Sequence, residues 1–523
     1  MKLGWLAIGM ALSTPAAANA ENPWFAQARD AIAEARALSA TQGRRAKNVI
    51  VFLGDGMGLT TVTAARILAG QLRGEHGEEN QLAFEQLPHL CLAKTYNTDQ
   101  QVPDSAGTMT AIMSGAKTRA GVIGLDETVP LNDATAAQQG HLPTLLEQAE
   151  DRGLATGVVT TARITHATPA AAFAHSPQRG WENDTRLSPE ARALDFPDIA
   201  RQLIEWPHGD GLDVVLGGGR QQFMPSQMAD PEYPDARGAR GDGRDLLAEW
   251  RARFPDGHYV WNRDAFEAVD PAQTTKLLGL FQPDHMHFEL DRAKDAAGEP
   301  SLAQLTEKAI AVLARNPNGY VLVVEGGRID HAHHSGNAQR ALVDTIAFSD
   351  AVRAAIQNTD AGETLIVVTA DHGHVMTLGG YPKRGNPILG KVVSNDYKTG
   401  KPKTEFEIDQ AGLPYTTIGY YNGPGAAAPG THPDPVVPHS APRDLTNVDT
   451  AAPDFLQVAA VPLGFETHSG EDVPVYAGGP GSELFHGVQE QSYLYHAMVE
   501  ALGWNDGLLG RSWRAMRGIM GWR

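Results

Sequence analysis

The stretch from Val49 to Gly56 reads VIVFLGDG, in which five apolar residues lead directly into a Gly-Asp-Gly turn. A short apolar run that ends at a glycine is typical of a strand buried on both faces of a sheet. Other runs of this kind are Ala155–Thr160, Val214–Leu216, Val321–Val324 and Leu365–Thr369. The sequence therefore predicts a sheet with both faces covered.

Helical patterns lie between or beside these runs, and examples are Thr144–Asp151, Leu302–Ala314 and Ala338–Gln357. Such alternation is typical of parallel strands, because parallel neighbours need long crossover connections. We therefore predict an α/β fold with a central, largely parallel sheet flanked by helices on both faces. In such a sheet, ligands bind beyond the carboxyl ends of the strands.

Two regions interrupt the alternating pattern. Residues 221–300 are rich in charged residues, glycine and proline, which predicts an insertion. Residues 378–465 are also rich in glycine and proline, and we call them the crown-like region. This region is expected to form an inserted surface subdomain on the sheet, not an independent domain.

The start of the chain has the pattern of a secretory signal peptide: Lys2, the mostly apolar Leu3–Leu12, and small residues at Ala18–Ala20. We expect residues 1–20 to be removed and residues 21–523 to form a periplasmic or secreted protein; an ordinary buried helix is the alternative. The apolar run is shorter than the roughly 20 residues that span a bilayer. No later apolar run is long enough either, and Gly510–Arg523 lacks a hydrophobic tail, so we expect no membrane anchor.

The composition, with 42% hydrophobic and 20% charged residues, is that of a globular protein. A net charge of −19 argues against nucleic-acid binding, because the phosphates would be repelled. The same charge means that a site for an anionic substrate needs local cations. Cys91 is the only cysteine, so no disulfide can form within the chain, and its neighbours do not fit the C-x-P-x-R pattern of a sulfatase.

Acidic residues stand at the ends of three predicted strands, and they are Asp55, Glu325 and Asp371. The carboxyl ends of parallel strands meet at one edge of a sheet, so these side chains are expected to gather there. Buried carboxylates that lie close together are costly unless cations neutralise them. The sequence therefore predicts a metal centre at this edge.

Histidines accompany these carboxylates. Asp330 and His334 are four residues apart, so on a helix they share one face and can bind one ion. His372 follows Asp371 directly, and His468 opens the segment HSG. Oxygen and nitrogen ligands without thiolate favour Zn²⁺ at the histidine positions, whereas carboxylate, hydroxyl and water favour Mg²⁺.

The candidate nucleophile is Ser105, in the segment VPDSAGTMTA from Val102 to Ala111. Pro103 and Asp104 mark a break before a helix, so Ser105 would lie near a helix N-terminus. Backbone N–H groups and the helix dipole favour anions at that position. The alternative is that Ser105 only caps the helix.

Together these segments resemble the alkaline phosphatase family, and they occur in the family's order. The matching segments are Lys47–Gly58, Asp104–Ala106, Thr165–Pro169, Glu325–His331, Thr369–His372 and Glu466–Asp472. The resemblance implies hydrolysis of phosphate monoesters to an alcohol and inorganic phosphate through a phosphoserine at Ser105. It also implies two Zn²⁺ ions, one Mg²⁺ ion and a homodimer.

The resemblance assigns a role to individual residues. It implies that Asp330, His334 and His468 bind the first zinc ion, and that Asp371, His372 and Asp55 bind the second. Asp55 would bridge to magnesium, whose other protein ligands would be Thr168 and Glu325. Arg179 matches the family's phosphate-binding arginine, whose planar guanidinium can bind two phosphate oxygens at once.

Some positions resemble the animal-type members of the family more than the enteric bacterial ones. His166 stands where the bacterial pattern has Asp, and His331 where it has Lys; Tyr381 matches an animal-type position near the partner subunit's active site. We expect His166, His331 and His374 to lie just outside the metal ligands. Gln282 stands where a Glu ligand of the animal-type calcium site is expected.

Six further histidines are predicted to be structural or exposed: His89, His141, His285, His287, His486 and His496. Two other functions stay open. A phosphodiesterase of the same superfamily usually has a Thr nucleophile and no arginine clamp, so Ser105 and Arg179 favour monoesters. A periplasmic phosphate- or metal-binding protein would not need a nucleophile between metal ions.

Overall fold

The computed structural model describes residues 44–426 and 444–504. The predicted signal peptide at residues 1–20 and part of the crown-like region therefore lie outside the described residues. Within them, ten strands form one sheet in the order β15-β2-β14-β8-β1-β7-β3-β4-β6-β5. The bounds are β1 Asn48–Gly54, β2 His89–Lys94, β3 Ala155–Arg163, β4 Val214–Gly218, β5 His258–Val260, β6 Leu277–Leu280, β7 Tyr320–Gly326, β8 Thr364–Ala370, β14 Val473–Gly478 and β15 Gly487–Glu490.

Strand β1 lies near the middle of the sheet and pairs in parallel with both β7 and β8. Val49 is opposite Val321 on one side and Leu365 on the other. The five residues from Val49 to Leu53 are fully buried, as their uninterrupted apolar run predicts. The five apolar runs identified in the sequence all form strands of this sheet, so the predicted α/β fold is confirmed.

Strand β14 is the exception to parallel pairing, since it runs antiparallel to both β8 and β2. β15 pairs with β2 in parallel and completes that side of the sheet. The sheet is therefore largely but not wholly parallel, as predicted.

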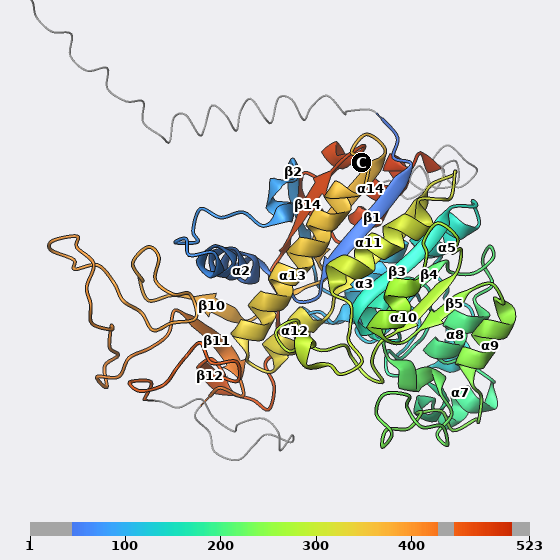
Figure 1. The fold of residues 1–523 in the computed structure, drawn as a ribbon, viewed down its shortest axis with the longest axis horizontal. Helices are drawn as coiled ribbons and strands as arrows, with labels where there is room; N and C mark the ends of the chain where they lie inside the picture. The colour runs from blue at the N-terminus through green and yellow to red at the C-terminus, as the bar shows by residue number, and fades with distance from the viewer. Residues whose placement is uncertain (1–43, 427–443, 505–523) are drawn as a thin grey trace, which may run out of the picture. The chain divides into compact units, whose positions relative to one another are not determined.

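Helices cover both faces of the sheet (Figure 1). Their bounds are α2 Leu59–Leu72, α3 Ser105–Ser114, α4 Ala134–Ala137, α5 Leu145–Glu150, α6 Ala167–Ala170, α7 Pro189–Ala193, α8 Ile199–Glu205, α9 Leu246–Arg253, α10 Arg263–Ala268, α11 Leu302–Leu313, α12 Arg328–His334, α13 Ala338–Gln357 and α14 Tyr493–Ala501. Helix α13 packs against α2, α11 and α12 on one face, and α3 packs against α5, α6 and α14 on the other. Helices α5 and α11 each begin with a capping box, from Thr144 and Ser301.

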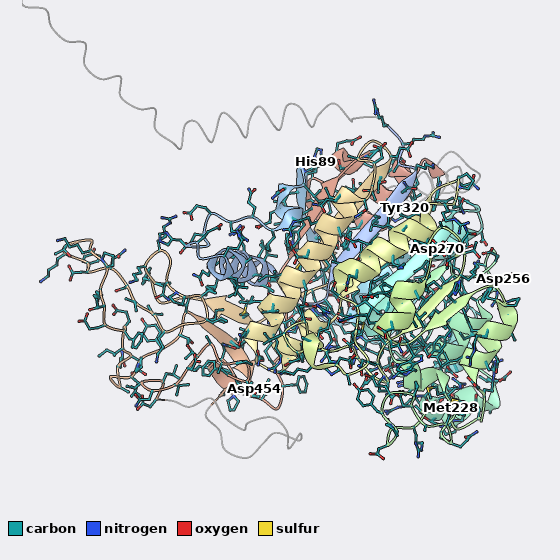
Figure 2. All side chains as sticks on the ribbon, in the orientation of Figure 1. His89, Met228, Asp256, Asp270, Tyr320 and Asp454 are labelled. Carbon is teal, nitrogen blue, oxygen red and sulfur yellow. The ribbon has the colours of Figure 1, made fainter. Side chains whose placement is uncertain are left out.

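The region 221–300 contains α9, β5, α10 and β6. Strands β5 and β6 continue the main sheet beyond β4, a feature that its charge and glycine content did not indicate. The crown-like region contributes a separate small sheet of β10 (Met376–Leu378), β11 (Ile418–Gly423) and β12 (Ala459–Pro462). In Figure 2, the labelled Met228 and Asp256 of the first region lie well apart from Asp454 of the crown-like region.

None of the described helices is long and apolar enough to cross a membrane.

The core contact between α13 and the sheet gives a stability prediction. Phe348 is fully buried and meets the rings of Phe52 and Phe84 at centroid distances of 5.9 and 6.1 Å. Phe348→Ala should lower the free energy of unfolding by about 3–5 kcal/mol, because burial is lost and a cavity is left. Val488→Ala, at a 54% exposed site on β15, is the control and should change it by less than about 0.5 kcal/mol. Equal denaturant midpoints for the two variants would contradict this packing.

Candidate active site

The predicted strand-end carboxylates lie side by side at the carboxyl edge of the sheet. Asp55 follows β1 and Asp371 follows β8. Glu325 is the penultimate residue of β7 and lies opposite Leu53. All three are fully buried. Burial, together with the charges of neighbouring carboxylates, raises the pKa of each carboxyl, and for Glu325 the pKa reaches about 8.

A first group of ligand atoms is formed by Asp330, His334 and His468. Oδ1 of Asp330 lies 3.2 Å from Nε2 of His334 and 3.3 Å from Nε2 of His468, and the two Nε2 atoms are 3.1 Å apart. Nδ1 of His334 donates to the carbonyl of Glu466, and Nδ1 of His468 donates to that of Pro103. Since each Nδ1 carries its hydrogen, each Nε2 is free to bind a metal ion.

A second group is formed by Asp55, Asp371 and His372. Nε2 of His372 lies 3.2 Å from Oδ2 of Asp371 and 3.5 Å from Oδ1 of Asp55. Oγ of Ser105 is 3.2 Å from the same Nε2 atom. The candidate nucleophile therefore lies directly beside this group.

A third group contains Asp55, Glu325 and Thr168. The Thr168 hydroxyl donates to Oδ2 of Asp55 at 3.5 Å, and Thr160 donates to Glu325. His166 joins Asp55 and Glu325 in a set whose possible ligand atoms lie within 4.8 Å of one another. This set combines oxygen ligands with one imidazole.

Several atoms of these groups are buried without a hydrogen-bond partner: Oδ1 of Asp55, Oε1 of Glu325, Oδ2 of Asp371 and Nδ1 of His372. Buried polar atoms normally have partners, and unpaired carboxylates that repel one another are especially costly. Divalent cations would satisfy these atoms and neutralise the charge, so the residues fit metal ions.

Ser105 is the first residue of α3, and its Oγ is almost fully buried. The capping role belongs to Asp104, whose Oδ1 accepts from the backbone N–H of Gly107 and of Gly121. Oδ2 of Asp104 accepts from Arg179 at 3.0 Å. Asp104 thus holds both the helix that carries Ser105 and the guanidinium of Arg179.

Three histidines gather beyond Arg179. His166 accepts from Arg179 at 3.1 Å, and its ring meets those of His285 and His331 at centroid distances of 5.3 Å. The ring centroids of His285 and His331 are 4.2 Å apart, and Nε2 of His285 lies 2.7 Å from a guanidinium nitrogen of Arg163. His285 was predicted to be structural or exposed, and no local sequence pattern indicated its place beside the site.

His374 connects the first group of ligands to the crown-like region. Its Nε2 lies 2.8 Å from Oδ1 of Asp330, and its Nδ1 lies 2.5 Å from Oε2 of Glu466. Burial would lower the pKa of His374, but these two carboxylates raise it to about 10. His374 therefore orients Asp330, and Glu466 in turn orients His374; no sequence pattern indicated this role of Glu466.

The first group opens into a cleft of about 590 Å³. Its lining includes Ser105, Arg179, His166, His331 and residues of the first metal group, with Phe465 at the rim. The structure thus brings together every catalytic and metal-binding residue predicted from the sequence.

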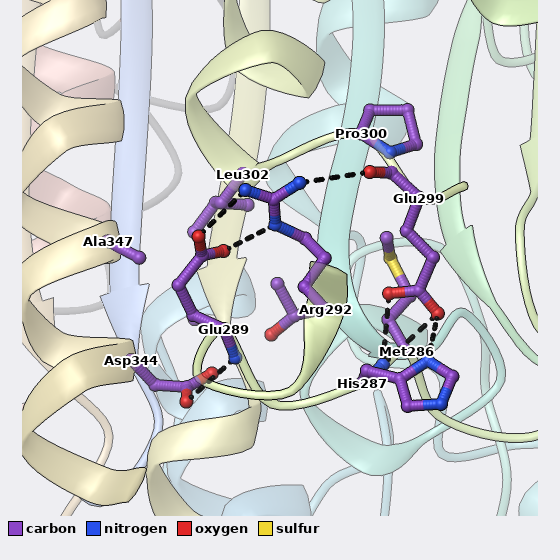
Figure 3. Close-up of a pocket in the computed structure, with 11 residues that line it drawn as sticks. Met286, His287, Glu289, Arg292, Glu299, Pro300, Leu302, Asp344 and Ala347 are labelled. Carbon is purple, nitrogen blue, oxygen red and sulfur yellow. Dashed lines mark hydrogen bonds and ion pairs between the residues drawn. The ribbon is translucent and has the colours of Figure 1, made fainter. Parts of the chain in front are cut away.

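A smaller cavity of about 10 Å³, roughly the space of one water molecule, lies between α13 and the segment after β6 (Figure 3). Its charged residues are paired with one another: Arg292 donates to Glu289, and His287 contacts Glu299. Asp344 accepts from the backbone N–H of Glu289 at 3.1 Å. This cavity is too small to hold a substrate.

Two acidic side chains, Glu232 and Asp295, form a pair beside Gln282. Burial and the neighbouring Asp295 together raise the pKa of Glu232 to about 7. Oε2 of Glu232 and Oδ2 of Asp295 are buried without hydrogen-bond partners, although Arg220 lies 3.5 Å from the former. Gln282 donates to Asp295 at 2.8 Å. The carboxylate pair fits a hard cation, with Gln282 as a neutral neighbour.

The fold and site define a class: a metal-dependent hydrolase with a serine beside clustered metal ligands at the carboxyl edge of an α/β sheet. Residues 46–504 match the family model for alkaline phosphatase. An alkaline phosphatase of Gadus morhua is 42% identical over 483 residues, which cover 91% of this chain and 96% of the relative. The tissue-nonspecific isozyme of Homo sapiens is 41% identical over 505 residues, which cover 95% and 92%.

Solved structures show the same fold. Thermus thermophilus alkaline phosphatase superposes with a TM-score of 0.60 at 24% identity, covering 88% of this chain and 92% of that one. The enzyme of the Antarctic bacterium TAB5 gives 0.57 at 22% identity, covering 88% and 98%. The chain belongs to the alkaline phosphatase family, whose members are metal-dependent hydrolases of phosphate monoesters. The predicted likeness to animal enzymes is confirmed by the animal relatives.

The buried Asp344 gives a pH-dependent prediction. Burial raises the pKa of Asp344 from 3.8 to about 8, against an opposing effect of Arg328. The folded state therefore keeps a proton that the unfolded state releases, so this contribution to stability is lost as pH rises from about 4 to 8. Asp344→Asn should remove it, and the wild type should lose up to about 3 kcal/mol more than the variant between pH 6 and pH 9. Denaturant unfolding of both proteins at the two pH values measures this; parallel losses would contradict it.

Proposed function

We propose that this chain hydrolyses phosphate monoesters through a phosphoserine formed on Ser105. The observation that carries the proposal is the position of Ser105 Oγ, 3.2 Å from Nε2 of His372 and at the N-terminus of α3. In the first step Oγ attacks phosphorus, the ester P–O bond breaks and the alcohol leaves. In the second step water cleaves the phosphoserine, which releases inorganic phosphate and restores the hydroxyl.

The proposed metal content is two Zn²⁺ ions and one Mg²⁺ ion. Asp330, His334 and His468 would hold the first zinc ion, and Asp371, His372 and Asp55 the second. Asp55 would also reach magnesium, together with Thr168 and Glu325. When bound, these ions lower the pKa of the Ser105 hydroxyl and neutralise charge on the phosphoryl group and the leaving oxygen.

The chain's own residues position the substrate. Arg179 is held by Asp104 at 3.0 Å and offers its guanidinium to two phosphate oxygens. His166 accepts from Arg179, and burial lowers the pKa of His166, so this imidazole is neutral and leaves the positive charge on the arginine. The backbone N–H groups at the start of α3 also favour the phosphate.

We also infer a homodimer that is periplasmic or secreted. The family resemblance supports the dimer, and the crown-like region has exposed apolar side chains, among them Tyr381, Phe406, Ile408 and Tyr421. Such residues are enriched at interfaces between subunits. The signal-peptide pattern of residues 1–20 supports export.

Replacing the nucleophile tests the proposed mechanism. Ser105→Ala should lower kcat for p-nitrophenyl phosphate by at least about 10²-fold, because no phosphoserine can form. Its metal content should stay unchanged, since the ligands remain. Ser114→Ala, at the other end of α3, is the matched control and should keep wild-type turnover. Wild-type turnover by the Ser105 variant, or no phosphate trapped on Ser105 at low pH by mass spectrometry, would refute the mechanism.

Removing the guanidinium tests phosphate binding separately. Arg179→Ala should raise KM and the inhibition constant of inorganic phosphate by roughly 10- to 100-fold, because charge-assisted hydrogen bonds are lost. Arg179→Lys should lie between, since an ammonium keeps the charge without the planar pair of donors. Steady-state kinetics with added phosphate give both constants. An unchanged inhibition constant in Arg179→Ala would exclude this role.

A further inference from the structure

A second cluster of ligand-type side chains lies outside the cleft. It contains Glu147 on α5, His175 in the segment that leads to Arg179, and His208 in the segment after α8. Glu147 and His175 are buried, with side chains 6% and 9% exposed, and His208 is 28% exposed. None of these residues takes part in the proposed mechanism.

The hydrogen bonds of the two histidines fix which ring nitrogen carries hydrogen. Nδ1 of His175 lies 2.6 Å from the carbonyl oxygen of Gly124, and Nδ1 of His208 lies 3.2 and 3.3 Å from the carboxylate oxygens of Asp151. A carbonyl or carboxylate oxygen only accepts, so Nδ1 donates in both rings. In a neutral imidazole, Nε2 then carries no hydrogen and has a lone pair available for a metal ion.

Both Nε2 atoms lie near the same oxygen, and the one of His175 makes a hydrogen bond to it. Oε1 of Glu147 lies 2.7 Å from Nε2 of His175 and 3.3 Å from Nε2 of His208. The other carboxylate oxygen, Oε2, accepts from the backbone N–H of Thr144 in the capping box of α5, which holds the carboxylate in place. Three atoms that can each donate an electron pair therefore lie close together around Oε1 of Glu147.

The arrangement repeats that of the first ligand group in the active site. There too, two histidines are tethered through Nδ1 to acceptors, while their Nε2 atoms lie 3.2 and 3.3 Å from one carboxylate oxygen, Oδ1 of Asp330. Acceptors that orient the outer nitrogen are typical of histidines that bind metal ions.

We propose that Glu147, His175 and His208 form a further site for a transition-metal ion of the zinc type, outside the catalytic cleft. Two imidazoles and a carboxylate suit Zn²⁺, with water from the exposed side of His208 as the fourth ligand. Ligand atoms around tetrahedral zinc lie roughly 3.3 Å apart, given bonds of about 2.0–2.1 Å. His208 matches that spacing relative to Glu147, and His175 needs a shift of about half an ångström.

An ion at this site would join α5, the segment after α8 and the segment that carries Arg179. His175 stands four residues before Arg179, and its ring is stacked on that of His141 at a centroid distance of 4.4 Å. The ion would act as a structural cross-link, and the chemistry at Ser105 would not depend on it. This inference does not rest on the proposed mechanism.

Without a metal ion, the contact between His175 and Glu147 is an ion pair with a protonated imidazole. Burial opposes this for His175, but its hydrogen bond to Glu147 raises its pKa overall. The two explanations differ in a measurable quantity, the number of tightly bound metal ions per chain.

Metal analysis of matched variants distinguishes them. Wild type, His208→Ala and His258→Ala would be purified as holoenzymes, dialysed with Zn²⁺, freed of unbound metal and measured by mass spectrometry; His258 is an exposed histidine on β5. We expect wild type and His258→Ala to hold one zinc equivalent more than His208→Ala, with phosphatase turnover within about twofold in all three. Equal zinc content in the three proteins would overturn the proposal.

Crystals of the zinc-loaded wild type provide a second test that does not depend on a variant that folds. Anomalous difference maps collected above and below the zinc edge should show a peak between Glu147 Oε1 and the two Nε2 atoms, in addition to peaks in the cleft. Peaks in the cleft alone would show that Glu147 and His175 form a direct ion pair, and would overturn the proposal.

Discussion

The repulsion among buried carboxylates at one edge of the sheet is the constraint on which the rest of this structure depends. Asp55, Glu325 and Asp371 are fully buried and lie on neighbouring strands. Carboxylates in such a place are tolerated only when cations share the site. The same fold that stacks the carboxyl ends of β1, β7 and β8 therefore also creates the demand for divalent metal ions.

Hydrogen bonds from surrounding residues hold the candidate metal ligands in position. His334 and His468 are oriented by backbone carbonyls, His374 links Asp330 to Glu466, and Asp104 holds both α3 and Arg179. Each of these contacts joins segments far apart in the chain. Divalent cations bound by these ligands would form a positive centre, and their local field would allow a chain with a net charge of −19 to attract a phosphate dianion.

The cluster of Glu147, His175 and His208 shows that the same arrangement occurs twice in the fold. In both places Nδ1 is tethered and Nε2 faces a carboxylate oxygen. The difference lies in the surroundings: the first group opens into a cleft beside Ser105, whereas the second joins helices and loops away from it. An ion bound by the second group would therefore be structural, whereas an ion bound by the first group would lie beside the candidate nucleophile.

The sequence by itself determined the central strands, the acids at their ends and the i, i+4 pair of Asp330 and His334. These follow from local rules, because an apolar run buries itself and helical spacing fixes which side chains share a face. The family's motifs added Ser105, Arg179 and the remaining ligands. Tertiary structure alone decided the antiparallel β14, the addition of β5 and β6 to the sheet, the place of His285, and the meeting of His175 with His208. The physical reason is that these depend on contacts between distant segments, which no local periodicity or composition specifies.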